Sequence, residues 1–415
     1  MLQDQWKTYP KCSNMKMLYE FQKDIINQIG PSYLLAMDTG TGKTITSIHQ
    51  YLKYSKGEPL LIVAPPQKLK EGGWKRDIQA VCDYYGVIIQ YSELSYGKLA
   101  DMYNLYKGWF VIFDEAHYIK NPTSQRGRAA KKLAKQSTHF NLLTATPASN
   151  GWEDTYNYFI MFGYFHSKKE MNDRYADWGT LHLGARKIPK IKGWHNEEQL
   201  YDMYDSFTIS ISKDDALDLP PLVFEDVKFN RSADYAKVAR DRILDGEEFD
   251  TPSKLAHALR YYANQKDKLD YASMLCESTE DNIVIFYYYQ KEIDTLKQVI
   301  KNKKFYTVNG KESSLPARDD WKDLKNTVTF VQYMAGAAGI ELQYANTVIF
   351  YTPTYSYQDY EQSLGRAYRN GQERKVTAYR FITQNTIEQA VYEALGNKKD
   401  FSEQLYLNTK LESEI

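Results

Sequence analysis

Short apolar runs that are rich in β-branched and aromatic residues alternate with longer amphipathic stretches in the first third of the chain. The runs lie at residues 33–37, 60–63, 87–89, 109–113 and 140–143. This alternation is typical of parallel sheets, because the connection between two parallel strands usually contains a helix. The pattern predicts one α/β domain over residues 1–150.

A second series of apolar runs begins after residue 280. Its members lie at residues 282–286, 304–307, 328–331, 347–350 and 376–381, again with helix-length stretches between them. This series predicts another α/β domain over residues 222–415. Two domains also agree with the length, because 415 residues exceed what a single hydrophobic core usually serves.

The stretch between the two series has a different composition. Residues 151–219 are rich in Tyr, Trp, Gly and charged residues, show no strand periodicity and end at Pro220 and Pro221. Adjacent prolines interrupt helices and strands alike, because proline lacks the backbone N–H that both need. We therefore expect a small helical protrusion and the connection between the domains at residues 151–221.

Composition excludes several classes of protein. Hydrophobic residues make up 43% and charged residues 26% of the chain, which excludes a disordered or collagen-like protein. No apolar run reaches the ~18 residues of a membrane span, and residues 1–16 lack the apolar segment of a signal peptide, so a cytoplasmic location without membrane contact is expected. The cysteines are far apart in sequence, which predicts free thiols rather than disulfides or a zinc site at Cys12, Cys82 and Cys276.

Charge is unevenly distributed, although the net charge is zero. Residues 1–150 contain 19 Lys and Arg against 12 Asp and Glu, whereas the remainder contains 34 against 41. A basic first domain permits contact with a polyanion without requiring it, because dedicated electrostatic binders are usually basic overall.

A glycine-rich segment, Asp38-Thr-Gly-Thr-Gly-Lys43-Thr44, follows the first predicted strand and precedes a helix-length stretch. Its glycines let backbone N–H groups close around phosphate oxygens, Lys43 supplies a charge and Thr44 can ligate Mg²⁺. The strict P-loop consensus has a glycine where Met37 stands, and a glycine turn that only opens a helix is the alternative. The order of strand, loop and helix favours an ATP site, whose candidate residues are Thr39, Gly40, Thr41, Gly42, Lys43 and Thr44.

The predicted strand at residues 109–113 leads directly into Asp114-Glu115-Ala-His117. Carboxylates at the carboxyl end of a parallel strand lie where ligands of open α/β folds bind. We assign Asp114 to Mg²⁺ and Glu115 to the base that orients and deprotonates an attacking water. The alternative, a solvated acidic strand end, is disfavoured by the P-loop, because hydrolysis needs both parts.

Two arginines, Arg366 and Arg369, are three residues apart in the second domain. On a helix this spacing places both on one face, from which they could reach a γ-phosphate. An arginine-rich surface face is the alternative if the segment is taken alone.

Taken in order, these segments resemble the motifs of superfamily two helicases, and specifically of Swi/Snf-type ATPases that translocate on double-stranded DNA. Residues 114–122, Asp-Glu-Ala-His-Tyr-Ile-Lys-Asn-Pro, are very close to the family's DEAHRIKNP, residues 37–44 resemble its motif I, and residues 362–372 resemble its motif VI. The resemblance extends from about Leu18 to Leu395. It implies two tandem RecA-like domains, with ATP and Mg²⁺ bound between them.

The resemblance also implies roles for single residues. Residues 18–22 resemble the adenine-reading Q motif, which would place Gln22 on the base, and residues 334–342 resemble motif V, which would place Gly339 and Glu341 at the nucleotide. By the likeness to motif VI, Arg366 and Arg369 are arginine fingers, so the catalytic set is Lys43, Glu115, Arg366 and Arg369.

DNA contacts are expected mainly on the phosphate backbone and without sequence preference. The resemblance places them near motif Ia at Lys68, Lys70 and Trp74, at Thr144 of the Thr-Ala-Thr-Pro motif and at Gly336 of motif V. A basic cluster without acidic members, which could also be a solvated helix face, adds Lys120, Arg126, Arg128, Lys131, Lys132 and Lys135.

Three departures from the family pattern leave the substrate and the coupling of the domains open. Glu341 replaces the usual Asn, Tyr368 replaces His, and residues 351–355 replace an Asp-Pro-Trp-Asn-like sequence. The short segment between the domains resembles that of compact bacteriophage or bacterial family members, for which the location would be the host cytoplasm.

The expected function is ATP-dependent translocation on mainly double-stranded DNA by a monomer, in replication, recombination or repair, with proteins of those pathways as possible partners. A helicase that separates strands of DNA or RNA remains an alternative. Another is an ATP-gated DNA clamp that recruits partners without moving, and a third is the motor subunit of a nuclease machine.

Overall fold

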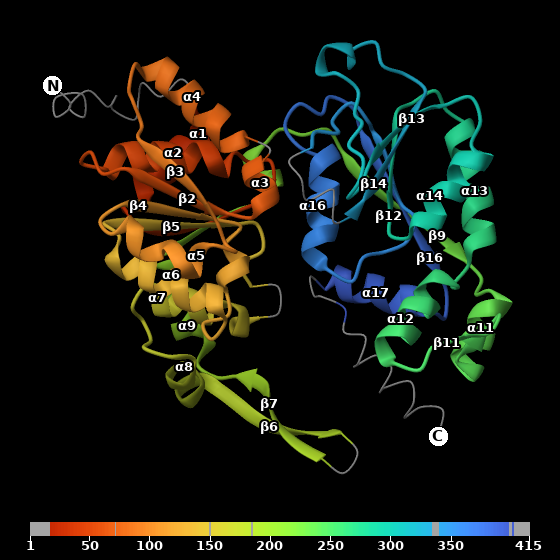
Figure 1. Ribbon diagram of the computed structural model, residues 1–415, viewed down its shortest axis with the longest axis horizontal. Coiled ribbons are helices and arrows are strands. Elements are labelled where there is room, and N and C mark those ends of the chain that lie inside the picture. The colour runs from red at the N-terminus through yellow and green to blue at the C-terminus, as the bar shows by residue number, and fades with distance from the viewer. Residues whose placement is uncertain are drawn as a thin grey trace. The chain divides into compact units, whose positions relative to one another are not determined.

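Two six-stranded parallel sheets organise the chain, each with helices on both faces (Figure 1). The computed structural model describes residues 17–70, 72–148, 151–183, 186–333, 340–397 and 401. The chain divides into two compact units, Met1–Ala216 and Leu217–Ile415. This architecture confirms the expected fold class of two tandem RecA-like domains.

The sheet of the first unit has the strand order β3-β2-β4-β5-β1-β8 and is parallel throughout. Its strands are β1 (Tyr33–Met37), β2 (Leu60–Ala64), β3 (Tyr91–Ser95), β4 (Phe110–Asp114), β5 (His139–Thr144) and β8 (Thr208–Ile211). The third strand was predicted at residues 87–89, but β3 begins four residues later. The prediction was wrong because β3 is a half-exposed edge strand without an apolar run.

Helices cover both faces of this sheet, which explains why its central strands are almost entirely buried and largely apolar. One face packs against α1 (Glu20–Gln28), α2 (Lys43–Tyr54) and α4 (Gly73–Tyr85). The other face packs against α5 (Leu99–Met102), α6 (Gln125–Gln136), α7 (Tyr156–Met161) and α9 (Glu197–Asp205).

The segment that was expected to be a helical protrusion and linker belongs to the first unit. It contains helices α7, α8 (Lys168–Tyr175) and α9, but also an antiparallel hairpin of β6 (Ala176–Leu183) and β7 (Arg186–Trp194). Strand β8 then pairs with β1 at the edge of the main sheet. The aromatic residues of this segment, such as Phe159 and Phe207, fill the core beneath the sheet, so they are structural.

The sheet of the second unit has the order β13-β14-β12-β15-β16-β9 and is also parallel. Its strands are β9 (Leu222–Phe229), β12 (Ile283–Tyr287), β13 (Lys304–Val308), β14 (Thr327–Gln332), β15 (Thr347–Phe350) and β16 (Val376–Thr383). All five predicted strands are present. The sixth, β9, was not predicted because charged residues interrupt its apolar positions, and it lies at the sheet edge.

Helices again cover both faces in the second unit. The helices α11 (Ala233–Asp241), α12 (Pro252–Tyr261), α16 (Tyr357–Ala367) and α17 (Ile387–Gly396) share one core. On the other face, a second core includes α13 (Gln265–Glu277) and α14 (Gln290–Val299).

Within the described ranges, no helix is both long enough and apolar enough to cross a membrane. Cys82 is partly buried and Cys276 is buried, and both are free thiols as expected. Cys12 lies outside the described residues.

One ion pair lies completely inside the second unit. Lys268 of α13 contacts Glu388 of α17, and neither side chain is exposed. The carboxylate of Glu388 also accepts a hydrogen bond from the backbone N–H of Thr383. Removing either charge would leave the other without compensation in the interior.

We predict that Lys268→Met lowers the free energy of unfolding by about 3–5 kcal/mol, because it leaves the carboxylate of Glu388 buried and unpaired. Urea unfolding followed by circular dichroism measures this loss. The double variant Lys268→Met/Glu388→Gln should recover part of it, since Gln still accepts from Thr383. Lys254→Met, which breaks an exposed pair with Asp250, is the control and should leave unfolding unchanged.

Candidate active site

The glycine-rich loop joins the end of β1 to the start of α2. Gly40 and Gly42 have φ angles of 87° and 83°, in the region that favours glycine. A Cβ atom on Gly42 would lie 2.3 Å from Nε2 of Gln22. Both the backbone conformation and the close approach of Gln22 therefore require glycine at this position.

Lys43, the first residue of α2, points back into its own loop. Its Nζ donates hydrogen bonds to the backbone oxygens of Met37 at 2.6 Å and Asp38 at 3.0 Å. Burial lowers the pKa of Lys43 to about 8, even though Glu115, Asp114 and Asp38 raise it. The ammonium group is thus held by the loop's own backbone within the electrostatic influence of these carboxylates, and its contact with phosphate stays a prediction.

Gln22 of α1 is almost fully buried and holds the loop in place. Its Nε2 donates to the backbone oxygen of Thr41 at 3.0 Å, and its Oε1 accepts from the backbone N–H of Tyr19 at 3.0 Å. The side chain of Thr41 is also directed inward, because its hydroxyl donates to the oxygen of Asp38. Gln22 therefore has a structural role that the sequence did not indicate, and its contact with adenine stays a prediction.

The acidic pair lies at the carboxyl end of β4. Asp114 is buried, and its carboxylate accepts hydrogen bonds from the indole Nε1 of Trp74 at 2.8 Å and from the backbone N–H of Glu115 at 3.0 Å. The hydroxyl of Tyr96 donates to the backbone oxygen of Asp114 at 2.8 Å. Glu115 has a φ of 55°, which is uncommon for a residue with a side chain and is typical of functional sites.

Lys68 bridges the two carboxylates. Its Nζ lies 3.0 Å from Asp114 and 2.9 Å from Glu115. Burial alone would raise the pKa of Glu115, but Lys68, then His117 and Lys43, lower it to about 2. The same carboxylates raise the pKa of Lys68 against the effect of burial. Glu115 is therefore charged at neutral pH, and the pair is arranged to receive a cation.

Three residues expected to contact nucleic acid have partners or are buried within the first unit, so their contact with DNA stays a prediction. Lys68 is held by the acidic pair, and Trp74 is buried with its indole on Asp114. Thr144 is fully buried at the end of β5, where its hydroxyl accepts from the backbone N–H of Thr146. Trp74 and Thr144 are thus buried and Lys68 is partly exposed, whereas Lys70 is exposed, as a contact residue must be.

The basic cluster is only partly available. Lys120 forms an ion pair with Asp154 at 2.9 Å. This acid is far from the cluster in sequence, so the sequence analysis did not include it. Arg128 is exposed but donates to the backbone oxygen of Thr123, and Arg126 lies over the ring of Tyr118. The side chains of Arg126, Lys132 and Lys135 remain exposed on α6.

The loop is also tied to the end of the first unit. The carboxylate of Asp38 accepts a hydrogen bond from the backbone N–H of Lys213 at 3.0 Å, and the N–H of Asp38 donates to the oxygen of Ile211 at 3.1 Å. Ile211 is the last residue of β8 and Lys213 follows it, shortly before the second unit begins at Leu217. The sequence gives no signal for this link, because its donors and acceptors are largely backbone groups.

The second unit carries the two candidate arginines, but not on one helix face. Arg366 lies in the last turn of α16, which ends at Ala367, so Arg369 lies beyond the helix. The expectation of a shared face is therefore wrong, because the backbone at Tyr368 turns out of the helical conformation with ψ of 85°. The backbone oxygen of Arg366 accepts from the N–H of Leu342 at 3.0 Å.

Gln372, which the sequence analysis did not single out, holds the segment after α16. Its side-chain amide donates to the backbone oxygens of Gln343, Ala345 and Ala367 at 2.9–3.2 Å. These bonds fix the segment that contains Arg369 onto residues 342–346. Glu341 lies nearby, 3.5 Å from Arg318, whereas Gly336 and Gly339 lie outside the described residues.

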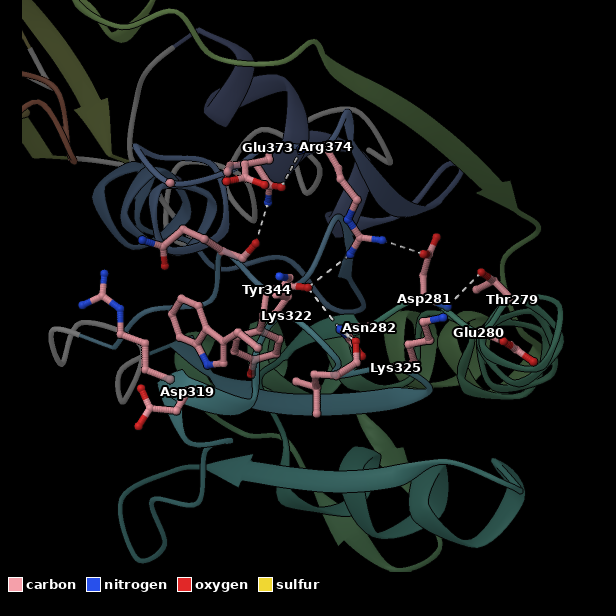
Figure 2. Close-up of a pocket in the computed structure, with 16 residues that line it drawn as sticks. Thr279, Glu280, Asp281, Asn282, Asp319, Lys322, Lys325, Tyr344, Glu373 and Arg374 are labelled. Carbon is pink, nitrogen blue, oxygen red and sulfur yellow. Dashed lines mark hydrogen bonds and ion pairs between the residues drawn. The ribbon is translucent and has the colours of Figure 1, made fainter.

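A cavity of about 860 Å³ lies at the amino ends of the strands in the second unit (Figure 2). Arg374 donates to Asp281 at 2.9 Å and to the backbone oxygen of Tyr344 at 3.2 Å, and Asn282 donates to the same oxygen. Figure 2 shows these bonds along the cavity wall. Basic and acidic side chains both line the cavity, so it favours neither anions nor cations. The hydrogen bonds of Arg374 hold the residues that directly follow Gln372.

Comparison with known protein families shows to which family the chain belongs. A model of the SNF2-related domain matches residues 74–232, and a model of the helicase conserved C-terminal domain matches residues 265–371. Together they cover more than half of the chain; the first match extends from the first unit through β9 of the second, and the second match lies within the second unit. The chain belongs to the SNF2-type helicases. This SNF2-type helicase is therefore an enzyme that uses ATP.

Relatives occur in bacteria and eukaryotes. The chain is 23% identical to the uncharacterized ATP-dependent helicase YqhH of Bacillus subtilis, over 91% of this chain and 77% of the relative. It is 23% identical to the ISWI chromatin-remodeling complex ATPase ISW1 of Saccharomyces cerevisiae, over 88% of this chain and 38% of ISW1. It is 22% identical to the DNA annealing helicase and endonuclease ZRANB3 of Bos taurus, over 92% and 40%. The chain thus spans less than half the length of the two eukaryotic relatives.

Among solved structures, the Sulfolobus solfataricus SWI2/SNF2 ATPase core in complex with dsDNA is 18% identical. The match covers 94% of this chain and 92% of that chain, with a TM-score of 0.43.

We predict that Gly42→Ala weakens ATP binding about tenfold or more, because it forces a side chain into a left-handed conformation and against Gln22. Fluorescent-nucleotide titration measures the change. Gly73→Ala is the matched control, since a Cβ there meets no atom within 4 Å. Equal binding by both variants would contradict the role of Gly42.

We predict that Lys68→Met moves the acid limb of the kcat/KM profile for ATP to higher pH. The charged form of Glu115 is present above its pKa and is lost as the pH falls through it, and removing Lys68 raises that pKa from about 2. Lys70→Met, in the same short helix α3 (Pro66–Lys70) but exposed, should leave the limb in place. An unchanged limb in Lys68→Met, with weaker DNA binding, would return Lys68 to the nucleic-acid contacts.

Proposed function

We propose that the chain hydrolyses ATP with Mg²⁺ and uses the cycle to move along DNA, mainly double-stranded DNA. One observation carries this proposal: Lys43 and the adjacent Asp114 and Glu115, which lie far from it in sequence, gather at one sheet edge in a chain with SNF2-related and helicase C-terminal domains. A phosphate-binding loop beside an acidic pair is what phosphoryl transfer to water requires.

In this proposal the first unit binds the nucleotide. The N–H groups around Gly40 and Gly42, with Lys43, hold the phosphates, while Thr44 and Asp114 hold Mg²⁺, which neutralises charge on the phosphates. The fit to a metal ion is supported by Lys68, whose ammonium group already lies between Asp114 and Glu115. The pair therefore accepts positive charge at this place.

Glu115 orients and deprotonates the attacking water. Because Lys68 holds the pKa of Glu115 at about 2, Glu115 is a weak base while the ion pair persists. We infer that Lys68 leaves Glu115 before hydrolysis, which raises the basicity of the carboxylate. Lys68 would thereby act as a positioning residue that controls when the base becomes effective.

The second unit supplies Arg366 and Arg369 to the transferred phosphate. Arginines that stabilise the transition state of phosphoryl transfer contribute about 10³–10⁵-fold in rate. The hydrogen bonds of Gln372 support this role, because they limit the positions that Arg369 can adopt.

The DNA contacts would be made by exposed cations of the first unit, namely Lys70, Arg126, Lys132 and Lys135. Contacts to phosphates give little sequence preference and a steep dependence on salt. Relatives named as a chromatin-remodeling ATPase and as a DNA annealing helicase favour DNA as the polymer. Work on DNA in replication, recombination or repair fits such a motor.

Two other functions are compatible with the same ATP site. A strand-separating helicase would act on single-stranded DNA or RNA, and an ATP-gated clamp would bind DNA without moving. They differ from the translocase in which polymer, if any, accelerates ATP hydrolysis.

We predict that duplex DNA stimulates ATP hydrolysis more strongly than single-stranded DNA or RNA. Glu115→Gln should lower the stimulated rate about 10²–10⁴-fold by removing the base, and Arg366→Ala about 10³-fold or more. Arg240→Ala, at an exposed arginine of the same unit paired with Asp241, is the control. Steady-state ATPase assays with each polymer, and with none, measure these rates.

Stimulation by single strands or RNA alone would replace the translocase with a conventional helicase. Slow hydrolysis that no polymer changes would favour the clamp.

A further inference from the structure

The β6–β7 hairpin of the first unit forms a two-stranded sheet of its own (Figure 1). Figure 1 shows it extending beyond α8 and α9, away from the six-stranded sheet. Trp178 and Ile188 are large hydrophobic residues on this hairpin, yet 55% and 43% of their surfaces are exposed. Because the hairpin contributes little to a core, its length and its exposed indole need another explanation.

Three lysines of β7 give the hairpin a positive charge. Lys187, Lys190 and Lys192 are exposed, and within the described part of the chain none of them has an acidic partner. The acid of the hairpin, Asp177, is bound to His195 at its base, at 2.8 Å. The three lysines span roughly 17 Å along the strand.

The strand register places these residues around the hairpin. Trp178 lies opposite Ile191, and Lys187 is on the same face because it is four residues from Ile191 along β7. Lys190 lies opposite Gly179 on the other face, and a Cβ on Gly179 would lie 2.2 Å from the side chain of Lys192. The hairpin therefore carries cations on both of its faces, with Lys187 on the face of Trp178 and with Lys190 and Lys192 on the other.

A cavity of about 580 Å³ lies where the hairpin joins the unit. Trp178 lines it together with Lys131 of α6, Lys168 of α8 and residues Pro122 and Thr123. Pro122 closes the stretch that begins with the acidic pair at Asp114. Lys168 lies over the ring of Tyr156 at 4.7 Å, which fixes its position at the cavity. The cavity thus continues the positive surface of the hairpin toward the body of the unit.

We propose that the hairpin and this cavity bind an unpaired strand of branched DNA, with a base on Trp178 and phosphates on Lys187, Lys190 and Lys192. This inference rests on the proposed function and names the DNA structure on which the motor acts. An exposed aromatic face beside unpaired cations is complementary to a ligand with both a π-face and negative charge. Single-stranded DNA offers both, whereas base pairing and stacking hide the base faces of a duplex.

The test compares forked DNA, with a single-stranded arm, and blunt duplex of equal length in fluorescence anisotropy titrations. We predict that Trp178→Ala weakens binding to the fork about 5- to 150-fold and leaves the blunt duplex nearly unchanged. Removing Lys187, Lys190 and Lys192 together, each to Ala, should lower the salt slope for the fork by about 2.

Matched controls keep the result specific. Tyr84→Ala removes another exposed aromatic side chain of the first unit, and the triple change of Lys311, Lys322 and Lys325 to Ala removes the same charge from the second unit. Because the hairpin residues are exposed, the variants should unfold at the temperature of the unchanged protein.

Unchanged fork binding in both hairpin variants overturns the proposal and makes an acidic protein the better occupant. Equal losses on fork and duplex also overturn it, because the site would then not discriminate an unpaired strand. If the unchanged protein binds neither DNA nor shows DNA-stimulated hydrolysis, the proposed function itself fails. If the hairpin variants still show duplex-stimulated hydrolysis, a failure of the hairpin proposal is distinguished from a failure of the proposed function.

Discussion

The ammonium group of Lys68 between Asp114 and Glu115 is the interaction on which the active site depends. Two adjacent carboxylates in a largely buried place repel each other, and burial alone would keep a proton on one of them. Lys68, with Trp74 and the N–H of Glu115 on the Asp114 side, stabilises both charges. Lys68 thus holds both carboxylates in one ion-paired cluster and lowers the pKa of Glu115.

The parallel sheet explains how distant residues meet around this pair. Strands β4, β5 and β1 are neighbours, so their carboxyl ends, with Asp114, Thr144 and the loop after Met37, share one edge. Thr144 lies between the other two and is enclosed by them, which is why it is buried rather than open to a polynucleotide. The same neighbourhood that assembles the ATP site removes a residue from the predicted DNA surface.

The sequence was sufficient for the features that depend on local pattern. Apolar runs located the central strands, and spacing located the loop at Lys43 and the acids at Asp114 and Glu115. It failed for β3, β8 and β9, because edge strands are half-exposed and carry no continuous apolar run. It also did not show the partners of Lys68 and Trp74, since these lie 46 and 40 residues away and the likeness to a motif does not say which way a side chain points.

The remaining features that the sequence did not predict depend on backbone hydrogen bonds, which any sequence can form. The bond from Lys213 N–H to Asp38 joins the start of the phosphate-binding loop to the last residues of the first unit. A shift of the backbone at Lys213 must either carry Asp38 with it or break this bond. Lys43 in turn donates to the backbone oxygen of Asp38. A displacement of Asp38 would therefore also affect the position of the Lys43 ammonium group. Hydrogen bonds thereby link the glycine-rich loop to the stretch of chain that leads into the second unit.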